Sequence, residues 1–428
     1  MLPKHLSEDF LHYVWRYQLF NATELQTTDG QPLQILQVGN YNTHAGPDFL
    51  AARLYIGAIL WAGNIEIHKR TSDWTRHNHS QNKQYDSVIL HVVYENDQTI
   101  QHSDQTPIPC LELKDRINSK LLHNYLSLKG IPDPIPCRVQ LPNFPSILKW
   151  QWLVRLTVER LQAKIEAWGN LPTLAQNDWE NTFFLLLARS FGLTNNTEPM
   201  ERIAASLPVV LLAKHKNNLS QIEALLFGQA GFLEESPHDD YMATLQKEYQ
   251  FLRHKHQLTP IQHSAWRFLR MRPPAFPTVR LAQLSALIHR SSHLWSKVLE
   301  AQLLSELEAL FHAEVSEYWQ SHYVFGKVST STEKGLSRDF VHLIIINTII
   351  PLLFLYGKLR HEESLMSRAI AFLEALPPEK NTIITEWKSL KWKPENAAHS
   401  QAILHLYKHY CTPRKCLECA VGQRIMKL

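Results

Sequence analysis

The chain has 428 residues, of which 44% are hydrophobic and 20% charged, and this composition excludes a disordered or fibrous protein. Its formal charge is +4, because 44 Lys and Arg nearly balance 40 Asp and Glu, so bulk charge alone does not indicate nucleic-acid binding. A chain of this length exceeds the roughly 250–300 residues at which a single core stops growing, and we expect at least two domains.

The N-terminal segment shows a helical pattern. Apolar residues recur at helical spacing from Phe10 to Leu19, behind Ser7 as N-cap and with Glu8 and Asp9 in the first turn. A charged-then-apolar signal peptide is not recognisable at this end, and 5 Cys in so long a chain favour a reducing compartment. We therefore expect a cytoplasmic protein.

Short segments rich in β-branched and aromatic residues follow, separated by turn residues as strands are. The polar stretch SDWTRHNHSQNKQY (72–85) interrupts them and is compatible with a helix. The order helix, three strands, helix, strand describes a small α/β unit. The strands are expected at residues 33–38, 49–56, 58–68 and 87–95, with a further strand at 108–114.

A Pro-rich stretch then separates this region from a predominantly helical one. Residues 131–145 (IPDPIPCRVQLPNFP) cannot continue a helix or a central strand. We expect an α/β domain at 1–130, a linker at 131–145 and an irregular helical domain at 146–428. The apolar run at 340–357 falls short of the roughly 20 residues that span a bilayer, so it is predicted to be a core helix and no membrane contact is expected.

Two short strings, GPDF (46–49) and EIHK (66–69), contain the acidic residues Asp48 and Glu66. Strand alternation places Glu66 and His68 on one face and Lys69 on the other. With a three-residue hairpin loop at 56–58, Asp48 falls opposite Glu66, with Cβ atoms about 4.5–5.5 Å apart. A two-residue loop would shift the register by one and put Asp48 on the wrong face.

This arrangement resembles the PD-(D/E)xK nuclease superfamily, whose core has the order αβββαβ. The resemblance covers about residues 5–97 and is carried by Pro-Asp at 47–48 and Glu-Ile-His at 66–68. It implies an α+β protein, with a restriction-endonuclease-like α/β domain followed by a mainly α-helical domain. Glu8 or Asp9 would match the acidic residue often present on the first helix of that superfamily.

The same resemblance implies that Asp48 and Glu66 hold Mg²⁺ or Mn²⁺, hard cations that take oxygen ligands and leave room for water and substrate phosphate. The sequence departs from the family pattern at the next position, because His68 occupies the place of the lysine and Lys69 comes one residue late. A histidine can hold or deprotonate a water near neutral pH. Alternatively, a bulge could turn Lys69 inward.

Histidines near the acidic pair offer a competing interpretation. His77 and His79 lie in the polar connection and His91 lies within an apolar strand, so a zinc-dependent hydrolase with imidazole ligands is an alternative. Against it, the two histidines of a His-x-His string diverge on a helix, and no HExxH string is present. We take these three residues, with His44 of the preceding loop, as candidate substrate-binding groups.

The stretch HYCTPRKCLEC (409–419) concentrates cysteines near the end of the chain. Cys411, Cys416 and Cys419 supply three soft ligands, one short of a closed zinc site or an iron–sulfur cluster. Such a metal would have a folding role. Some nucleases of helicase–nuclease repair complexes hold an iron–sulfur cluster with one early cysteine and a late group, and this chain resembles that layout with a different spacing. The fourth ligand could be one of three residues: His409, Cys137 or Cys110.

A basic and aromatic segment, WRFLRMRPPAFPTVRLAQL (266–284), contains Arg270, Arg272 and Arg280. Arginines can clamp phosphates while aromatic rings stack on bases, so we take these arginines as candidate substrate-binding residues for nucleic acid.

The residues together predict a metal-dependent phosphodiesterase that acts on DNA or RNA. The alternative is a non-catalytic nucleic-acid-binding or scaffold protein with a degenerate nuclease fold, in which His68 marks a lost lysine. The wider chain, through GNIEIHKRTSDWTRHNHS, VILHVVYEND and the terminal cysteines, also resembles a bacterial family of unknown function.

Overall fold

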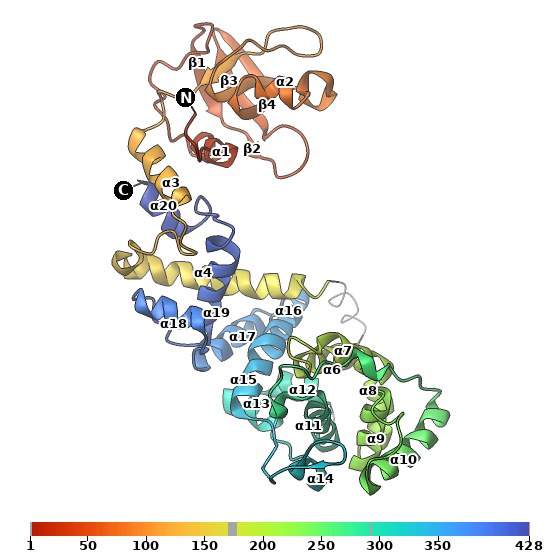
Figure 1. Ribbon diagram of the computed structural model, residues 1–428. Helices are drawn as coiled ribbons and strands as arrows, with labels where there is room; N and C mark the ends of the chain where they lie inside the picture. The colour runs from red at the N-terminus through yellow and green to blue at the C-terminus, as the bar shows by residue number, and fades with distance from the viewer. Residues whose placement is uncertain (1, 170–177, 292, 428) are drawn as a thin grey trace. The chain divides into compact units, whose positions relative to one another are not determined.

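The computed structural model describes residues 2–169, 178–291 and 293–427 (Figure 1). The contacts within the chain divide it into two compact units, of which unit 2 is Leu153–Thr385 with Pro394–Ile403. Unit 1 is assembled from three segments: Met1–Trp152, Glu386–Lys393 and Leu404–Leu428. This division differs from the expected domains at 1–130 and 146–428, because the last segment of the chain packs with the N-terminal region.

Unit 1 contains a mixed sheet in the order β1-β3-β4-β5-β6, with the short β2 paired to β3. The pairs β1–β3 and β3–β4 are antiparallel, whereas β4–β5 and β5–β6 are parallel. β5 is buried along nearly its whole length, as its continuous apolar sequence VILHVVY predicts. The strands are β1 (Leu33–Gln37), β2 (Asn40–Tyr41), β3 (Phe49–Ile56), β4 (Ile59–Arg70), β5 (Val88–Glu95) and β6 (Cys110–Glu112).

The β3–β4 hairpin is tighter than expected. Ile56 pairs with Ile59, so the loop has two residues, Gly57 and Ala58, in place of the three predicted at 56–58. Gly57 has φ +58°, the left-handed backbone that such tight turns need. With this loop alone, Asp48 would not lie opposite Glu66.

A β-bulge in β3 restores the register that places Asp48 opposite Glu66. The register shifts by one residue between Phe49 and Ala52, and Ala51 takes the left-handed conformation with φ +58°. Beyond the bulge Phe49 pairs with Ile65, and the next pair along the strands is therefore Asp48 with Glu66. The predicted opposition of these two carboxylates is present, although a short loop and a bulge produce it together.

Helices α1 and α2 both contact β4 (Figure 1). α1 (Glu8–Arg16) starts at Ser7, whose Oγ accepts a hydrogen bond from the Phe10 amide at 3.3 Å. α2 covers only Asp73–Arg76, so the helix predicted over 72–85 is wrong beyond its first turn. Asn78 has φ +58°, which ends the helix, and the chain continues as two short 3₁₀ turns.

The C-terminal segment of unit 1 packs on helices near the Pro-rich stretch. α20 (Ala420–Lys427) lies beside α3 (Ser119–Gly130), and Asn124 Nδ2 donates to the Ile425 carbonyl at 3.1 Å (Figure 1). The buried Trp392 ring likewise donates from Nε1 to the Leu141 carbonyl at 3.1 Å. These long-range contacts explain why residues far apart in sequence share one unit.

Unit 2 is mainly helical and encloses a large apolar core. Three helices have residues in both units: α4 (Ser146–Glu166), α18 (Thr382–Ser389) and α19 (Ala397–Leu406). The remaining helices are α6 (Trp179–Phe191), α7 (Thr197–Ser206), α8 (Val209–His215), α9 (Leu219–Gln229), α10 (Asp240–His256), α11 (Pro277–Arg290), α12 (Leu294–Glu300), α13 (Leu304–Leu310), α14 (Glu317–Ser321), α15 (Arg338–Ile344), α16 (Ile350–Arg360) and α17 (Glu363–Ala375), beside the hairpin β7 (His322–Val324) and β8 (Lys327–Val328).

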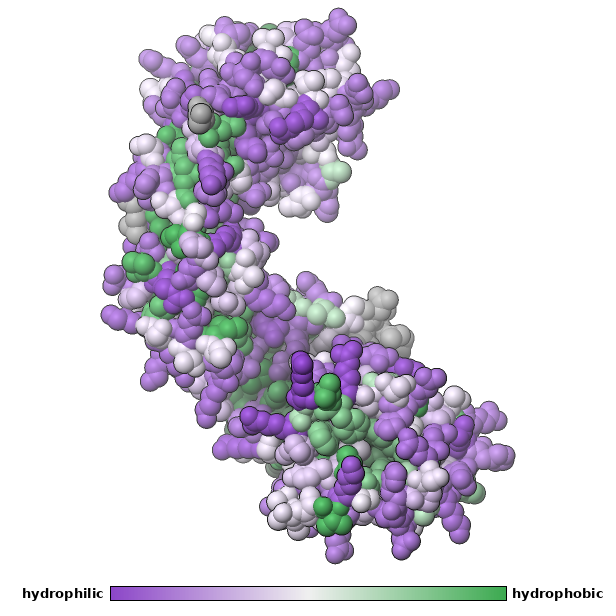
Figure 2. All heavy atoms as spheres, in the orientation of Figure 1, coloured by the Kyte–Doolittle hydropathy of each residue, from purple (hydrophilic) through white to green (hydrophobic). Residues whose placement is uncertain are grey.

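The predicted core helix in this unit is continuous from Arg338 to Arg360. A π-helical turn at Ile345–Ile349 precedes Pro351, which cannot donate a backbone hydrogen bond. Length and composition would allow the helix to cross a membrane, but 78% of its apolar window is buried inside the protein. Figure 2 shows hydrophilic side chains over most of the visible face, interrupted by apolar patches.

The bulge leads to a stability prediction. Because Ala51 has a left-handed backbone, Ala51→Gly should raise the free energy of unfolding by about 1 kcal/mol. The matched control is Ala62→Gly in the facing strand, which should lower it by about 0.5–1 kcal/mol. Urea unfolding of both variants measures the two effects, and equal losses of stability would contradict the bulge geometry.

Candidate functional site

The paired carboxylates are linked by reciprocal hydrogen bonds across β3 and β4. The Asp48 amide donates to Glu66 Oε2 at 3.2 Å, and the Ile67 amide donates to Asp48 Oδ2 at 2.9 Å. From α1, His12 Nε2 lies 3.2 Å from Asp48 Oδ2. Glu66 is only 5% exposed, so the pair forms a largely buried acidic centre.

Imidazoles surround the other oxygen of Glu66. Its Oε1 lies 3.5 Å from His68 Nε2 and 3.4 Å from His79 Nε2, and His68 Nε2 lies 3.1 Å from His77 Nδ1. Ligand atoms of His68, His77 and His79 all fall within 4.8 Å of one another. Three imidazole nitrogens at these separations, with a carboxylate oxygen beside two of them, could hold a transition-metal ion.

The convergence of His77 and His79 depends on the residue between them. The sequence interpretation expected the two side chains to diverge on a helix, and this expectation was wrong because Asn78 adopts φ +58°. The left-handed residue reverses the chain direction, so both imidazoles turn towards His68. Asparagine tolerates this conformation better than most residues, and it is the one local signal in the sequence for the turn.

Neighbouring side chains hold the imidazoles in place. His91, which is fully buried on β5, has Nε2 at 2.8 Å from His68 Nδ1, on the side of the ring away from Glu66. Trp74 contacts the edges of His79 and His91, and Tyr85 stacks on His79 with ring centroids 3.8 Å apart. The structure thus places His91 directly behind His68, where it would fix the ring and tautomer of that residue.

Burial shifts the ionisation of the carboxyl group and of the imidazoles towards their neutral forms. Desolvation, followed by the charge of Asp48, raises the pKa of Glu66 to about 9. Burial also lowers the pKa of His68, His79 and His91, with neighbouring imidazoles adding to the shift at His68 and His91, so these rings are neutral at pH 7. Neutral imidazoles are the form that binds metal.

His79 provides a separate indication of a missing partner. Within the described part of the chain, neither of its ring nitrogens has a hydrogen bond, and both are buried. A buried polar atom without a hydrogen bond costs roughly 1–3 kcal/mol. A cation between His79 Nε2 and Glu66 would remove that cost at one of the two nitrogens.

Sequence reasoning missed His12, Trp74 and Tyr85. His12 lies one helical turn after Glu8, and this i, i+4 spacing was an available signal. Burial lowers the pKa of His12, but the hydrogen bond and charge of Asp48 outweigh it, and the pKa is raised overall. Glu8 acts on the site through its charge, which contributes to the raised pKa of Glu66.

Other predicted residues are placed less centrally. His44 is exposed in the loop before β3, where its amide donates to Asn42 Oδ1 at 2.9 Å. Lys69 lies on β4 between the buried His68 and Arg70, on the face opposite Glu66 by strand alternation. In unit 2, Arg270 and Arg272 are exposed, and the Arg280 guanidinium lies 3.7 Å from the centre of the Phe340 ring.

The cysteines form a second group within unit 1. All five thiols are free, and electrostatic interactions link Cys411 to Cys137, Cys416 and Cys419. Cys110 is separate on β6, with side-chain hydrogen bonds to Thr28 and Thr71. His409 is exposed and stacks on His405 with ring centroids 4.4 Å apart.

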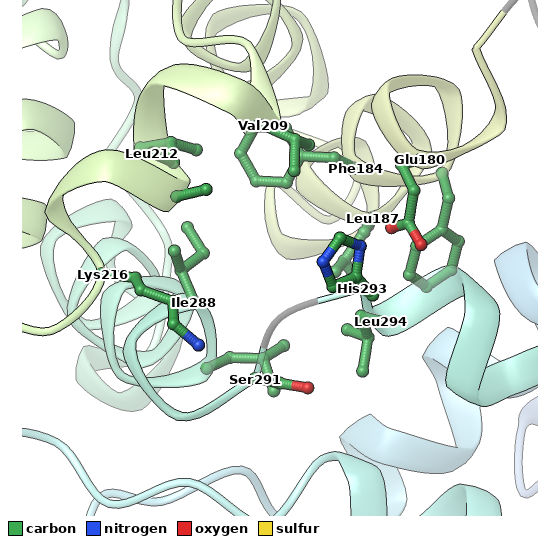
Figure 3. Close-up of a pocket in the computed structure, with 13 residues that line it drawn as sticks. Glu180, Phe184, Leu187, Val209, Leu212, Lys216, Ile288, Ser291, His293 and Leu294 are labelled. Carbon is green, nitrogen blue, oxygen red and sulfur yellow. The ribbon is translucent and has the colours of Figure 1, made fainter.

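Unit 2 contains a small apolar pocket of about 80 Å³ (Figure 3). Its walls include Phe184, Leu187 and Leu212, with Glu180 and Lys216 on opposite sides. The Glu180 carboxylate accepts hydrogen bonds from the first turn of α12, so it is occupied in holding that helix. Among the described residues that line this pocket, ligand atoms do not converge as they do at His68, His77 and His79.

The ionisation of Glu66 predicts how the metal-free protein responds to pH. Because its folded pKa is raised, the folded state keeps a proton that the unfolded state has lost, and stability falls as the pH rises towards about 9. Above about pH 7 the histidines with lowered pKa are neutral in both states and add no slope. In Glu66→Gln this loss of stability, at most about 1.4 kcal/mol per pH unit, should be smaller, while the raised pKa values of His12 and the cysteines continue to contribute to it. The free energies of unfolding of the wild type and of Glu66→Gln, measured in chelator between about pH 7 and about pH 9, test this prediction. Parallel curves of stability against pH would contradict the raised pKa of Glu66.

A comparison with protein families matches residues 8–382 to a model described as "Protein of unknown function (DUF2851)". The matched range includes the carboxylates, the imidazoles and Cys137, and it ends before the C-terminal cysteines. No curated protein and no solved structure matches the chain. Because the match covers most of the chain, the chain belongs to the DUF2851 family.

Proposed function

We propose that this protein is a metal-dependent phosphodiesterase acting on DNA or RNA, with its active site at Asp48, Glu66 and the surrounding imidazoles. The observation that carries the proposal is the direct opposition of two carboxylates at the end of a hairpin, with His68 on the same face. Two adjacent carboxylates, one of them buried with a raised pKa, need a cation to be ionised together.

The order of elements supports a nuclease-like fold for the N-terminal part of unit 1. α1, β1, β3, β4, α2 and β5 follow one another as helix, three strands, helix and strand, with the short β2 added beside β3. This is the αβββαβ order of the PD-(D/E)xK superfamily. Asp48 immediately precedes the second of these strands, and Glu66 lies in the third, as the half-motifs of that superfamily require.

The ligand set favours a transition metal over Mg²⁺. Mg²⁺ prefers six oxygen ligands, whereas imidazole nitrogens suit Zn²⁺, Fe²⁺ or Ni²⁺. Glu66, His68, His77 and His79 would hold the ion, and His91 would orient His68. This observation also keeps a zinc-dependent hydrolase of another substrate class as the second candidate.

The remaining side chains have places in hydrolysis at phosphorus. A bound transition metal supplies Lewis acidity to an oxygen in its shell. Asp48 accepts the Ile67 amide through Oδ2, and His12 lies beside the same oxygen with a raised pKa, so this pair can accept or donate a proton near neutral pH. Lys69 has no role in this scheme. His68, which stands where the superfamily has its lysine, would act as a metal ligand.

Cleavage of a mixed panel of DNA and RNA tests the proposed activity. Wild-type protein with Mn²⁺, Zn²⁺ or Mg²⁺ should cleave at least one substrate, and Asp48→Asn and Glu66→Gln should each reduce the rate by ~100-fold or more. Lys69→Ala, on the same strand but the opposite face, should retain activity and serves as the matched control. Absence of cleavage with every metal would favour the non-catalytic alternative, and hydrolysis of esters or amides alone would favour the second candidate.

Measurements of metal affinity distinguish the proposed ligands from the residues around them. Calorimetric titration with Zn²⁺ or Mn²⁺ should show one high-affinity site that His77→Ala and His79→Ala weaken strongly, because each removes one ligand. His91→Gln should weaken it by about 10–100-fold through the orientation of His68. His44→Ala, an exposed histidine of the same unit, should bind as wild type does; unchanged affinity in His77→Ala and His79→Ala would exclude the imidazole site.

A further inference from the structure

The group Cys137, Cys411, Cys416 and Cys419, called here the cysteine cluster, brings two distant parts of the sequence together in unit 1. Cys137 belongs to the Pro-rich stretch, Cys411 ends a π-helical turn at Tyr407–Cys411, and Cys419 directly precedes α20. Hydrogen bonds join the same two segments beside the thiols. Arg414 Nη2 donates to the Asp133 carbonyl, and Lys129 Nζ donates to the Arg414 carbonyl, each at 3.2 Å.

The four sulfurs lie near one another without forming disulfides. Cys411 interacts electrostatically with the other three members, and Cys137 interacts with Cys416 and Cys419. Cys411 and Cys419 are each 7% exposed, and the remaining two are partly buried. Burial raises the pKa of each thiol, and for Cys137 it does so to about 12, so the metal-free thiols are protonated.

The local backbone is shaped to accept a thiolate at Cys419. The amides of Val421 and Gly422, in the first turn of α20, form hydrogen bonds to the Cys419 sulfur. A Cβ atom on Gly422 would lie 2.2 Å from the Cys416 carbonyl oxygen, so only glycine lets the helix approach the loop this closely. The positive charges of Lys129 and Arg414 act on Cys416 and would offset the negative charge of thiolate ligands.

We propose that Cys137, Cys411, Cys416 and Cys419 ligate an iron–sulfur cluster that fastens the C-terminal segment to the Pro-rich stretch. Four cysteine ligands complete the set that such clusters use. Neither His409 nor Cys110 is needed: His409 stacks on His405, and Cys110 lies on β6 of the sheet. The proposal is independent of the hydrolase site, which shares no residue with it.

Spacing of the sulfurs favours a polynuclear cluster over a single zinc ion. Zinc with bonds of about 2.3 Å draws four tetrahedral thiolates to within about 3.8 Å of each other. Among the described residues, the group whose ligand atoms all lie within 4.8 Å is His68, His77 and His79, and the four thiols are not such a group. A cluster of several iron and sulfide ions holds its thiolates further apart than one zinc ion does.

The test is the metal content of the full chain purified without oxygen. Wild-type protein should contain iron and acid-labile sulfide in equal amounts, with the broad visible absorption of an iron–sulfur chromophore. Cys137→Ser and Cys419→Ser should lose both iron and sulfide, whereas Cys110→Ser and His409→Ala should retain them. The last two variants are matched controls, one for the loss of a thiol and the other for the loss of a nearby ligand group.

Two measurements keep the result interpretable if a cysteine variant folds poorly. Wild-type protein exposed to oxygen and chelator should lose the visible absorption, and proteolysis should then cut within residues 408–415 faster than in the intact protein. Stoichiometric zinc that Cys137→Ser and Cys419→Ser lose, without iron or sulfide in the wild type, would overturn the iron–sulfur assignment. Metal-free wild-type protein with an unchanged proteolysis pattern would overturn the metal site itself.

Discussion

The register between β3 and β4 is the constraint on which the candidate active site depends. Strand side chains alternate between faces, so a shift of one residue would separate Asp48 from Glu66 entirely. The two-residue turn at Gly57–Ala58 alone would produce that shift, and the bulge at Ala51 cancels it. Two local irregularities of opposite effect therefore bring the carboxylates together, and each requires a residue with positive φ.

The sequence predicted the parts of this arrangement that periodicity controls. The strands, the shared face of Glu66 and His68 and the position of Asp48 follow from alternation and from turn residues. The convergence of His77 and His79 did not follow, because it depends on one left-handed residue, Asn78, that a helical interpretation overlooks. His12 shares a face of α1 with Glu8, but its contact with Asp48 depends on how α1 packs on the sheet, which that spacing alone does not specify.

The domain division shows a similar limit. The five prolines at 131–145 mark a break in regular structure, but they do not separate two compact units. The docking of α20 on α3 and the burial of Trp392 over Leu141 place later segments in the same unit. Such contacts join residues too far apart for composition or periodicity to reveal. The rarity and grouping of the cysteines led to the prediction of a shared metal site, which stays a prediction.

The order of segments in unit 1 has a consequence for synthesis on the ribosome. The sheet region and Cys137 emerge first, yet the unit also needs Leu404–Leu428, which are made only after the whole helical unit. At about 5–20 residues per second, this interval lasts roughly tens of seconds. During it the apolar surface of α3 that α20 later covers is exposed to water. The segments of unit 2 are complete before the last segment of unit 1, so unit 1 is the later of the two to receive all of its residues.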